Sequence, residues 1–303
     1  MISAVPLPGA LRRHLNATLQ SFLSGRTGEQ IDFHRPPGEE ALIPAKSVSW
    51  RIFKNPVALF VGGTAAVILE LAEPAVRAGV WEHSSFRKNP LGRLQRTGLA
   101  AMITVFGARS IAEPMIARVV KMHAAIQGRT PSGAIYSATD PRLLTWVHAT
   151  AAFGFGAAYS RFVGPLHDAD LNRLYGEGSP VSHLYGAIDP PRSVEEMDTL
   201  FESSAAEFAP SPIIYEFLQI MRNTPAFPGP LRWLQPMLVR AAVELIPGWM
   251  RDRLGLSQGY ELRPYERWLV KTMGASSDRL ILPASPAVQS CLRLGLPVSH
   301  LYS

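Results

Sequence analysis

The sequence predicts an all-α fold that forms one globular domain around a large apolar core. Apolar residues recur with the helical period of 3.6 residues through most of the chain, whereas sustained alternation with period two is missing. The 26 prolines mostly stand between the periodic segments, where they separate one helix from the next. Apolar residues make up 47% of the 303 positions and charged residues only 18%. That composition can supply a large core, or a core that contains a sizeable apolar pocket.

The first half of the chain is expected to begin with an amphipathic helix over residues 7–24, followed by a polar, proline-containing connection over 25–44. Val57–Ala78 has the pattern of a buried helix with a kink at its internal proline. Pro90–Phe106 starts with a proline, which is favourable in a first turn, and ends before a glycine. Ala108–Ile126 then forms the next helix, which ends near a second glycine.

The second half continues in the same way. A helix is expected to begin after Thr139 or Asp140, either of which is a good N-cap, and to run from Pro141 to about Phe162. Ser193 and Glu196 form a capping box, which starts a helix that reaches about residue 208. Further helices are expected at Ile213–Arg222, Leu231–Leu245 and Arg263–Thr272. We assign residues 1–303 to a single domain, with an N-terminal helix and connection over 1–50 and a C-terminal tail over 276–303.

The charge pattern argues against nucleic acid as a partner. The formal net charge is +6 and the isoelectric point is about 9.7, but the 30 basic residues are scattered and form no basic tail. Arginine dominates over lysine, which suits paired carboxylates or the anionic groups of a cofactor better than a solvated basic patch. The single cysteine, Cys291, permits no disulfide within the chain.

The sequence indicates a soluble, cytoplasmic protein without an integral membrane span. The arginine pair at positions 12 and 13 is not followed by a continuous apolar stretch, so a twin-arginine signal is poorly supported. The most apolar segment, Pro56–Leu69, is shorter than the roughly 20 residues that a spanning helix needs. Peripheral membrane contact stays open, and the oligomeric state is not specified.

Several common catalytic motifs are missing from the sequence. Val61–Thr64 contains two glycines but neither the spacing nor the lysine of a phosphate-binding loop. There is no His-Glu-x-x-His motif, no cysteine pair that could hold zinc, and no Gly-x-Ser-x-Gly motif of a hydrolase. These absences weaken nucleotide and hydrolase chemistry as functions.

His123 is the residue on which we expect enzymatic chemistry to centre. It lies on one face of its predicted helix with Ile116, Val119, Val120 and Ile126. A histidine within an apolar stripe is more often a satisfied core residue than a ligand, and the spacing alone favours that interpretation. The alternative is a haem ligand, because haem is a large apolar body with an axial position for an imidazole.

Other polar residues stand on apolar helices. Arg93, Arg96 and Thr97 share one helix face, and they need either an acidic partner or a bound anion. Glu70 and Glu73 interrupt an apolar segment; a buried glutamate would need a partner, and its raised pKa could suit a catalytic base.

Two further histidines are interpreted without a catalytic role. His148, on a buried helix, is expected to be a core residue or to support a neighbouring ligand. His83, in a loop beside Glu82, is expected to be exposed.

Six ordered segments make the sequence similar to a known family. They are Glu73–Arg87, Asn89–Thr97, Val105–Gly107, His123–Gly128, Tyr136–Pro141 and Trp146–Thr150. Together they resemble the oxygenase family of the fungal MpaB protein and the bacterial rubber oxygenase, or latex clearing protein. The resemblance is good from Arg51 to Tyr215 and looser in the C-terminal third.

The resemblance implies an all-helical fold that holds one haem b, iron protoporphyrin IX. It implies that His123 is the axial iron ligand and that Arg93 and Thr97 lie on the distal side. In the rubber oxygenase a lysine able to bind the iron precedes the threonine, whereas Arg96 stands here. Because arginine stays protonated, we expect water or an open position as the sixth ligand.

The family's catalytic glutamate cannot be placed by spacing. Glu70, Glu73 and Glu82 are all candidates, and Glu82 is our choice. Glu73 is itself a departure, since many relatives have histidine there.

The resulting prediction is a haem-dependent oxygenase that activates dioxygen and acts on an apolar, isoprenoid-like small molecule. In it, Arg93, Arg96 and Thr97 would stabilise bound oxygen and developing negative charge. The alternatives are a haem oxidase or peroxidase-like enzyme with another substrate, a non-catalytic haem-binding or lipid-binding helical protein, and a relative without haem in which His123 is simply packed.

Overall fold

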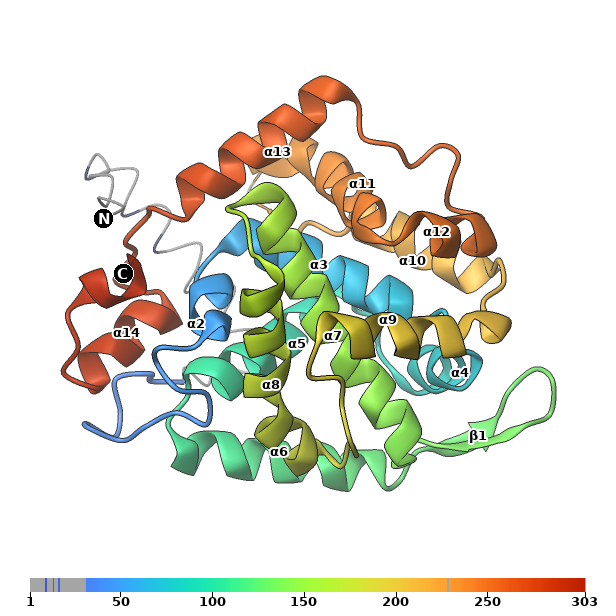
Figure 1. Ribbon diagram of the computed structural model, residues 1–303, viewed down its shortest axis with the longest axis horizontal. Coiled ribbons are helices and arrows are strands. Elements are labelled where there is room, and N and C mark those ends of the chain that lie inside the picture. The colour runs from blue at the N-terminus through green and yellow to red at the C-terminus, as the bar shows by residue number, and fades with distance from the viewer. Residues whose placement is uncertain (1–8, 10–12, 14–15, 17–30, 228, 303) are drawn as a thin grey trace.

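The computed structural model describes residues 9, 13, 16, 31–227 and 229–302, and it confirms the all-α fold class. The helix predicted over residues 7–24 lies outside the described residues apart from single positions. The longer helices form the body of the domain, with one short antiparallel hairpin at its edge (Figure 1). In chain order the elements are α2 Val48–Phe53, α3 Pro56–Glu70, α4 Pro74–His83, α5 Pro90–Phe106, α6 Arg109–His123, β1 Gln127–Arg129, β2 Ile135–Ser137, α7 Pro141–Phe162, α8 Asp168–Tyr185, α9 Val194–Ser203, η1 Ala205–Glu207, α10 Pro212–Asn223, η2 Gly229–Leu234, α11 Gln235–Leu245, α12 Gly248–Leu254, α13 Pro264–Ser277, α14 Pro286–Arg293 and η3 Val298–Tyr302.

Two helices occupy the segment where the sequence predicted one kinked helix. The chain turns by 111° between α3 and α4. Pro74 is the first residue of α4, and it holds the preceding residue, Glu73, in an extended conformation with ψ of 121°. The Glu73 side chain then caps α4 by accepting a hydrogen bond from the Val76 N–H at 2.7 Å. The prediction of a continuous helix was therefore wrong at this point, because the proline starts a new helix instead of kinking the old one.

The centre of the domain is the crossing of α3 and α7, which lie against each other in the middle of Figure 1. Two glycines make this close approach possible. A Cβ on Gly62 would lie 2.8 Å from the Gly154 carbonyl oxygen, and a Cβ on Gly154 would lie 2.5 Å from the Gly62 carbonyl oxygen. Both positions therefore accept only glycine without a shift of the backbone.

Buried side chains form two apolar clusters. The larger cluster contains the buried faces of α3, α7, α10 and α11. The second cluster joins α5, α6 and α14 to the segment before α2. Trp50 stabilises the second cluster, since its indole N–H donates to the carbonyl oxygens of Ile43 and Val105.

No single helix among the described residues is long and apolar enough to cross a membrane. The bent pair of α3 and α4 passes a test of length and composition when its two members are taken together. Most of α3 is buried in the core, however, as Val57, Val61, Ala65 and Ile68 illustrate.

Candidate functional site

Three polar side chains from three helices are linked electrostatically, because the charge of Arg93 acts on both Glu70 and His123. Glu70 is the last residue of α3, Arg93 lies in the first turn of α5, and His123 is the last residue of α6. Asn89 fixes the start of α5, because its side chain accepts a hydrogen bond from the Gly92 N–H at 3.1 Å. All three site residues are partly buried.

The charges of these residues influence one another. Burial raises the pKa of the Glu70 carboxyl from 4.5 to about 7, and the positive charge of Arg93 opposes that rise. Burial also lowers the pKa of Arg93, with Glu70 acting in the opposite direction. The pKa of His123 is lowered by burial first and by the charge of Arg93 second. Near neutral pH the imidazole is therefore uncharged and the carboxyl is only partly ionised.

Two of the three side chains have a buried nitrogen atom without a hydrogen-bond partner among the described residues. These atoms are Nε of Arg93 and Nδ1 of His123. A buried donor without a partner costs about 1 to 3 kcal/mol, so folded proteins rarely leave one unless a ligand, ion or water completes it. The two atoms thus fit a site that receives a polar or metal-containing ligand.

His148 has another nitrogen of this kind, as do Arg51 and Arg251 at their Nε atoms among the described residues. His148 lies on α7, and its Nε2 atom is buried without a hydrogen-bond partner among the described residues. Its ring packs over Gly178 of α8, where a Cβ would lie 3.1 Å from the ring carbon Cε1. Burial and the nearby His183 lower the pKa of His148 to about 4, so its imidazole is neutral at physiological pH. The sequence predicted that His148 is a core residue or supports a neighbouring ligand; the structure shows it half-buried, with only its Nε2 atom fully enclosed and unpartnered.

The other predicted site residues lie nearer the surface. Arg96 and Thr97 are exposed, and Arg96 donates a hydrogen bond to Ser85 Oγ at 2.6 Å. The charge of Arg96 is still close enough to influence Arg93. Glu82 is exposed at the end of α4 and accepts a hydrogen bond from the Tyr136 hydroxyl at 3.3 Å. Its interactions are thus with the β-hairpin, and none of them involves Arg93 or His123.

Glu73 has a structural role. Besides capping α4, its buried carboxylate forms an ion pair with Arg142 at 3.2 Å. Both carboxylate oxygens are thereby occupied, which leaves Glu70 as the candidate glutamate that interacts with Arg93. His83, predicted to be exposed, is exposed at the end of α4.

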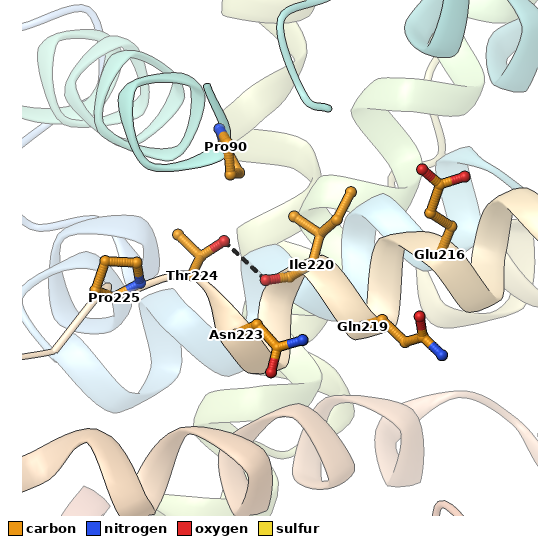
Figure 2. A pocket seen from close by; sticks show the side chains of 7 residues that line it. All are labelled: Pro90, Glu216, Gln219, Ile220, Asn223, Thr224 and Pro225. Atoms are coloured by element: carbon orange, nitrogen blue, oxygen red, sulfur yellow. Dashed lines mark hydrogen bonds between the residues drawn. The ribbon is translucent and has the colours of Figure 1, made fainter. Parts of the chain in front are cut away.

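A surface groove of about 350 Å³ lies elsewhere, between the start of α5 and the C-terminal half of α10 (Figure 2). Its wall combines Pro90 with polar side chains of α10 such as Glu216, Gln219 and Asn223. Thr224 also lines the groove, and its hydroxyl donates a hydrogen bond to the Ile220 carbonyl oxygen at 2.7 Å. The groove is open, and none of the predicted site residues lines it, so we place the candidate site at Glu70, Arg93 and His123 instead.

Within the described residues, no three His, Cys, Asp or Glu side chains lie together as a group that could hold a metal ion.

Residues 50–275 match the model of a protein family described as the catalytic domain of the ER-bound oxygenase mpaB/B' and the rubber oxygenase. The chain belongs to this family. No curated protein and no solved structure matches it. Membership of the MpaB and rubber oxygenase family supports a general oxygenase role.

The family match extends farther along the chain than the sequence resemblance suggested. It begins in α2 and ends in α13, whereas the clear resemblance ended at Tyr215. The family region therefore includes the α3–α7 crossing and all three side chains of the candidate site. It leaves out α14, which closes the second apolar cluster.

Proposed function

We propose that this chain is a haem b-dependent oxygenase that acts on an apolar substrate. The observation that carries the proposal is the convergence of Glu70, Arg93 and His123, two of them with unpartnered buried nitrogens, within a member of an oxygenase family. The residues present fit a haem: an imidazole for the iron, a guanidinium for anionic oxygen atoms, and apolar walls. Haem, when bound, supplies the binding and activation of dioxygen.

His123 is the proposed iron ligand. Only a neutral imidazole offers a nitrogen lone pair to a metal, and burial together with Arg93 keeps His123 neutral near pH 7. His123 is the last residue of α6 and Ala124 is the C-cap of that helix, so the end of the helix fixes where the ring begins. The buried Nδ1 atom has no hydrogen-bond partner among the described residues, so it is the ring nitrogen available to a ligand.

Arg93 is proposed to hold negative charge at the site. Its guanidinium carries a permanent charge, and its Nε–H is buried and ready to donate. A fixed donor in a poorly hydrated site stabilises an anionic oxygen more strongly than the same donor in water. Arg96 would reinforce the positive potential from its exposed position, and Thr97 would contribute a hydroxyl from the adjoining surface.

Glu70 replaces Glu82 as the glutamate that we propose for proton transfer. A base works best when its pKa lies near the working pH, and the pKa of Glu70 is raised to about 7. The carboxyl can therefore both accept and release a proton at neutral pH. Glu82 is exposed and hydrogen-bonded to the hairpin, away from the charges of the site.

An apolar substrate, such as an isoprenoid-like molecule, suits the surroundings of these residues. Leu94, next to Arg93, packs against the larger apolar cluster. Val119 and Val120, one turn before His123, pack against the second cluster. Walls of this kind favour an apolar molecule and exclude water from reactive species.

Absorption spectroscopy of the purified protein tests the haem assignment. We expect a Soret band in the wild type after haem addition, loss of that band in His123→Ala, and an unchanged band in the control variant His83→Ala, because His83 is exposed. An unchanged band in His123→Ala would overturn the ligand assignment. No band in the wild type after haem addition would overturn the haem proposal itself.

Matched glutamate variants test the proton-transfer role. Glu70→Gln should retain the Soret band but lower turnover by about 100-fold or more, while Glu82→Gln should retain both. Turnover would be followed as incorporation of labelled oxygen into an isoprenoid-like alkene, which separates an oxygenase from an oxidase or peroxidase. Normal turnover in Glu70→Gln together with low turnover in Glu82→Gln would assign proton transfer to Glu82 instead.

Arg93→Ala provides a further check on the site. It should lower turnover far more than haem content if the guanidinium stabilises negative charge that develops during turnover. Equal loss of both would instead assign it to holding the haem.

A further inference from the structure

The outer face of α13 combines aromatic and basic side chains in a way that the proposed oxygenase chemistry does not use. The inner face of α13 packs against α3, α7 and α11 through Val270 and Gly274. On the opposite face the Tyr265 side chain is 59% exposed and Trp268 is 67% exposed. These two positions are three residues apart, so the rings lie on the same face of the helix.

The exposed charges along α13 and its ends are mostly positive. Lys271 follows Trp268 by three residues, and Arg263 and Arg279 flank the helix; all three are exposed. The two acidic residues of the segment, Glu266 and Asp278, are buried and form ion pairs with Arg240 and Lys54.

One exposed carboxylate, Glu261, precedes the helix in the adjoining loop. The outer face of α13 itself, defined by Tyr265, Trp268, Lys271, Thr272 and Ala275, therefore carries a net positive charge.

The chemistry of this face fits the surface of an anionic lipid bilayer. Tyrosine and tryptophan are enriched at membrane interfaces, because their rings enter the acyl boundary while their polar atoms stay at the headgroups. Lysine and arginine beside them bind lipid phosphates and are attracted by the negative surface potential. A bilayer also accepts a convex helix without a complementary groove, and α13 runs along the outer edge of the molecule (Figure 1).

We propose that the outer face of α13 binds the surface of an anionic bilayer. Tyr265 and Trp268 enter the interfacial layer, and Lys271, Arg263 and Arg279 contact lipid phosphates. The binding is peripheral, because the inner face of α13 stays packed on the core of the domain. The proposal stands independently of haem, since none of these residues belongs to the candidate site.

Co-sedimentation of the full chain with lipid vesicles tests the proposal. We expect binding to vesicles of phosphatidylcholine mixed with phosphatidylserine, and at least about tenfold weaker binding to phosphatidylcholine alone or in high salt. Trp268→Ala and Tyr265→Ala should each weaken binding by about tenfold, through loss of buried apolar area. Lys271→Glu should weaken it by a similar factor, about tenfold, through loss of attraction and added repulsion.

Two control variants change the same chemistry at the other side of the molecule. Ile135, on the hairpin, is 74% exposed, and Lys121 is exposed on α6; both elements lie opposite α13 in Figure 1. Ile135→Ala and Lys121→Glu should bind vesicles as the wild type does. Circular dichroism would verify that every variant is folded.

Three outcomes would overturn the proposal. The first is absence of wild-type binding to the anionic vesicles. The second is vesicle binding by Trp268→Ala and Lys271→Glu with the affinity of the wild type. Loss of vesicle binding in Lys121→Glu alone would equally overturn the proposal, because it would assign the membrane-binding surface to α6. The third is a wild-type dimer in gel filtration that Trp268→Ala dissociates, without vesicle binding by either protein, which would make the face a contact between two copies.

Discussion

Glu70→Gln is expected to change the pH dependence of folding stability in a defined direction. The carboxyl ionises near 4.5 in the unfolded chain, but burial raises its pKa to about 7 in the native state. Between these values the native protein binds more protons than the unfolded chain, so the contribution of Glu70 to stability falls as the pH rises. Glutamine keeps nearly the same shape and hydrogen-bonding groups but does not titrate.

The size of the effect follows from the two pKa values. One pKa unit corresponds to about 1.4 kcal/mol of free energy. The rise in the pKa of Glu70 from 4.5 to about 7 therefore changes the free energy of unfolding by about 2 to 3 kcal/mol, after a reduction for the partial exposure of the side chain. The stability of Glu70→Gln relative to the wild type should therefore increase by about 2 to 3 kcal/mol between about pH 4.5 and about pH 8. Arg93 retains its charge in both proteins and adds only a constant difference.

Urea denaturation of the two proteins at equal haem content, across this pH range, measures the difference directly. Other titrating groups are common to both proteins and cancel in the subtraction. A difference that stays constant with pH would show that Glu70 ionises normally in the native state, and it would remove the basis for its assignment as a proton-transfer group. A difference that declines with rising pH would show that Arg93 holds the carboxylate ionised.

Three further predictions concern packing, pH and capping. In urea denaturation, Gly154→Ala should destabilise the protein by about 1 to 3 kcal/mol or more, because the new Cβ would meet the Gly62 backbone. The control variant Gly176→Ala, which has open space around the new Cβ on α8, should be neutral or stabilising by up to about 1 kcal/mol. Burial lowers the pKa of His148 from 6.5 to about 4, so its contribution to the free energy of unfolding is lost as the pH falls through that range. In His148→Gln the free energy of unfolding should therefore fall less steeply with decreasing pH than in the wild type. The same pH dependence in both proteins would contradict the burial argument. Glu73→Ala should cost about 1 to 2 kcal/mol through loss of the α4 cap, and a thermal midpoint equal to that of the wild type would show that the cap contributes nothing.

Much of the fold could be predicted because local signals and burial agree. Pro90–Phe106 and Pro141–Phe162 begin and end where the proline and capping signals place them. Ser193 is the N-cap that the sequence predicted, and its hydroxyl accepts from the Glu196 N–H at 3.1 Å. The Glu196 carboxylate accepts from the N–H of Arg192 at 2.7 Å, one residue before the cap, so only half of the predicted capping box forms. The helix that it starts ends at Ser203, five residues short of the expected end, and a 3-10 turn follows.

Other elements could not be predicted because their local signals oppose the observed structure. The helix α8, Asp168–Tyr185, contains two glycines and Pro180, which local propensity disfavours; packing against α6 and α7 outweighs it. The hairpin of β1 and β2 has only three residues in each strand, too few for a periodic pattern.

The candidate site was predictable in its residue types and less so in its spatial grouping. His123 and Arg93 were identified from helix faces and family segments, and in the structure the charge of Arg93 helps to lower the pKa of His123. Choosing among the glutamates needed the three-dimensional structure. The break at Pro74 turns the chain between Glu70 and Glu73, so that one faces Arg93 and the other caps α4. Sequence spacing does not reveal which side of such a turn a side chain takes.

The glycine contact between α3 and α7 has a consequence for how the domain can move. Since the two backbones meet at Gly62 and Gly154 without side chains between them, neither helix can slide or rotate without a backbone collision or a void. These two helices therefore act as a fixed frame to which Glu70 and His148 belong. Widening that admits a bulky molecule at the site is then expected from helices outside this frame, such as α5, α6 and α8, which carry Arg93, His123 and Gly178. The frame would hold Glu70, the proposed base, still, while the proposed iron ligand His123 and the Arg93 guanidinium move with their helices.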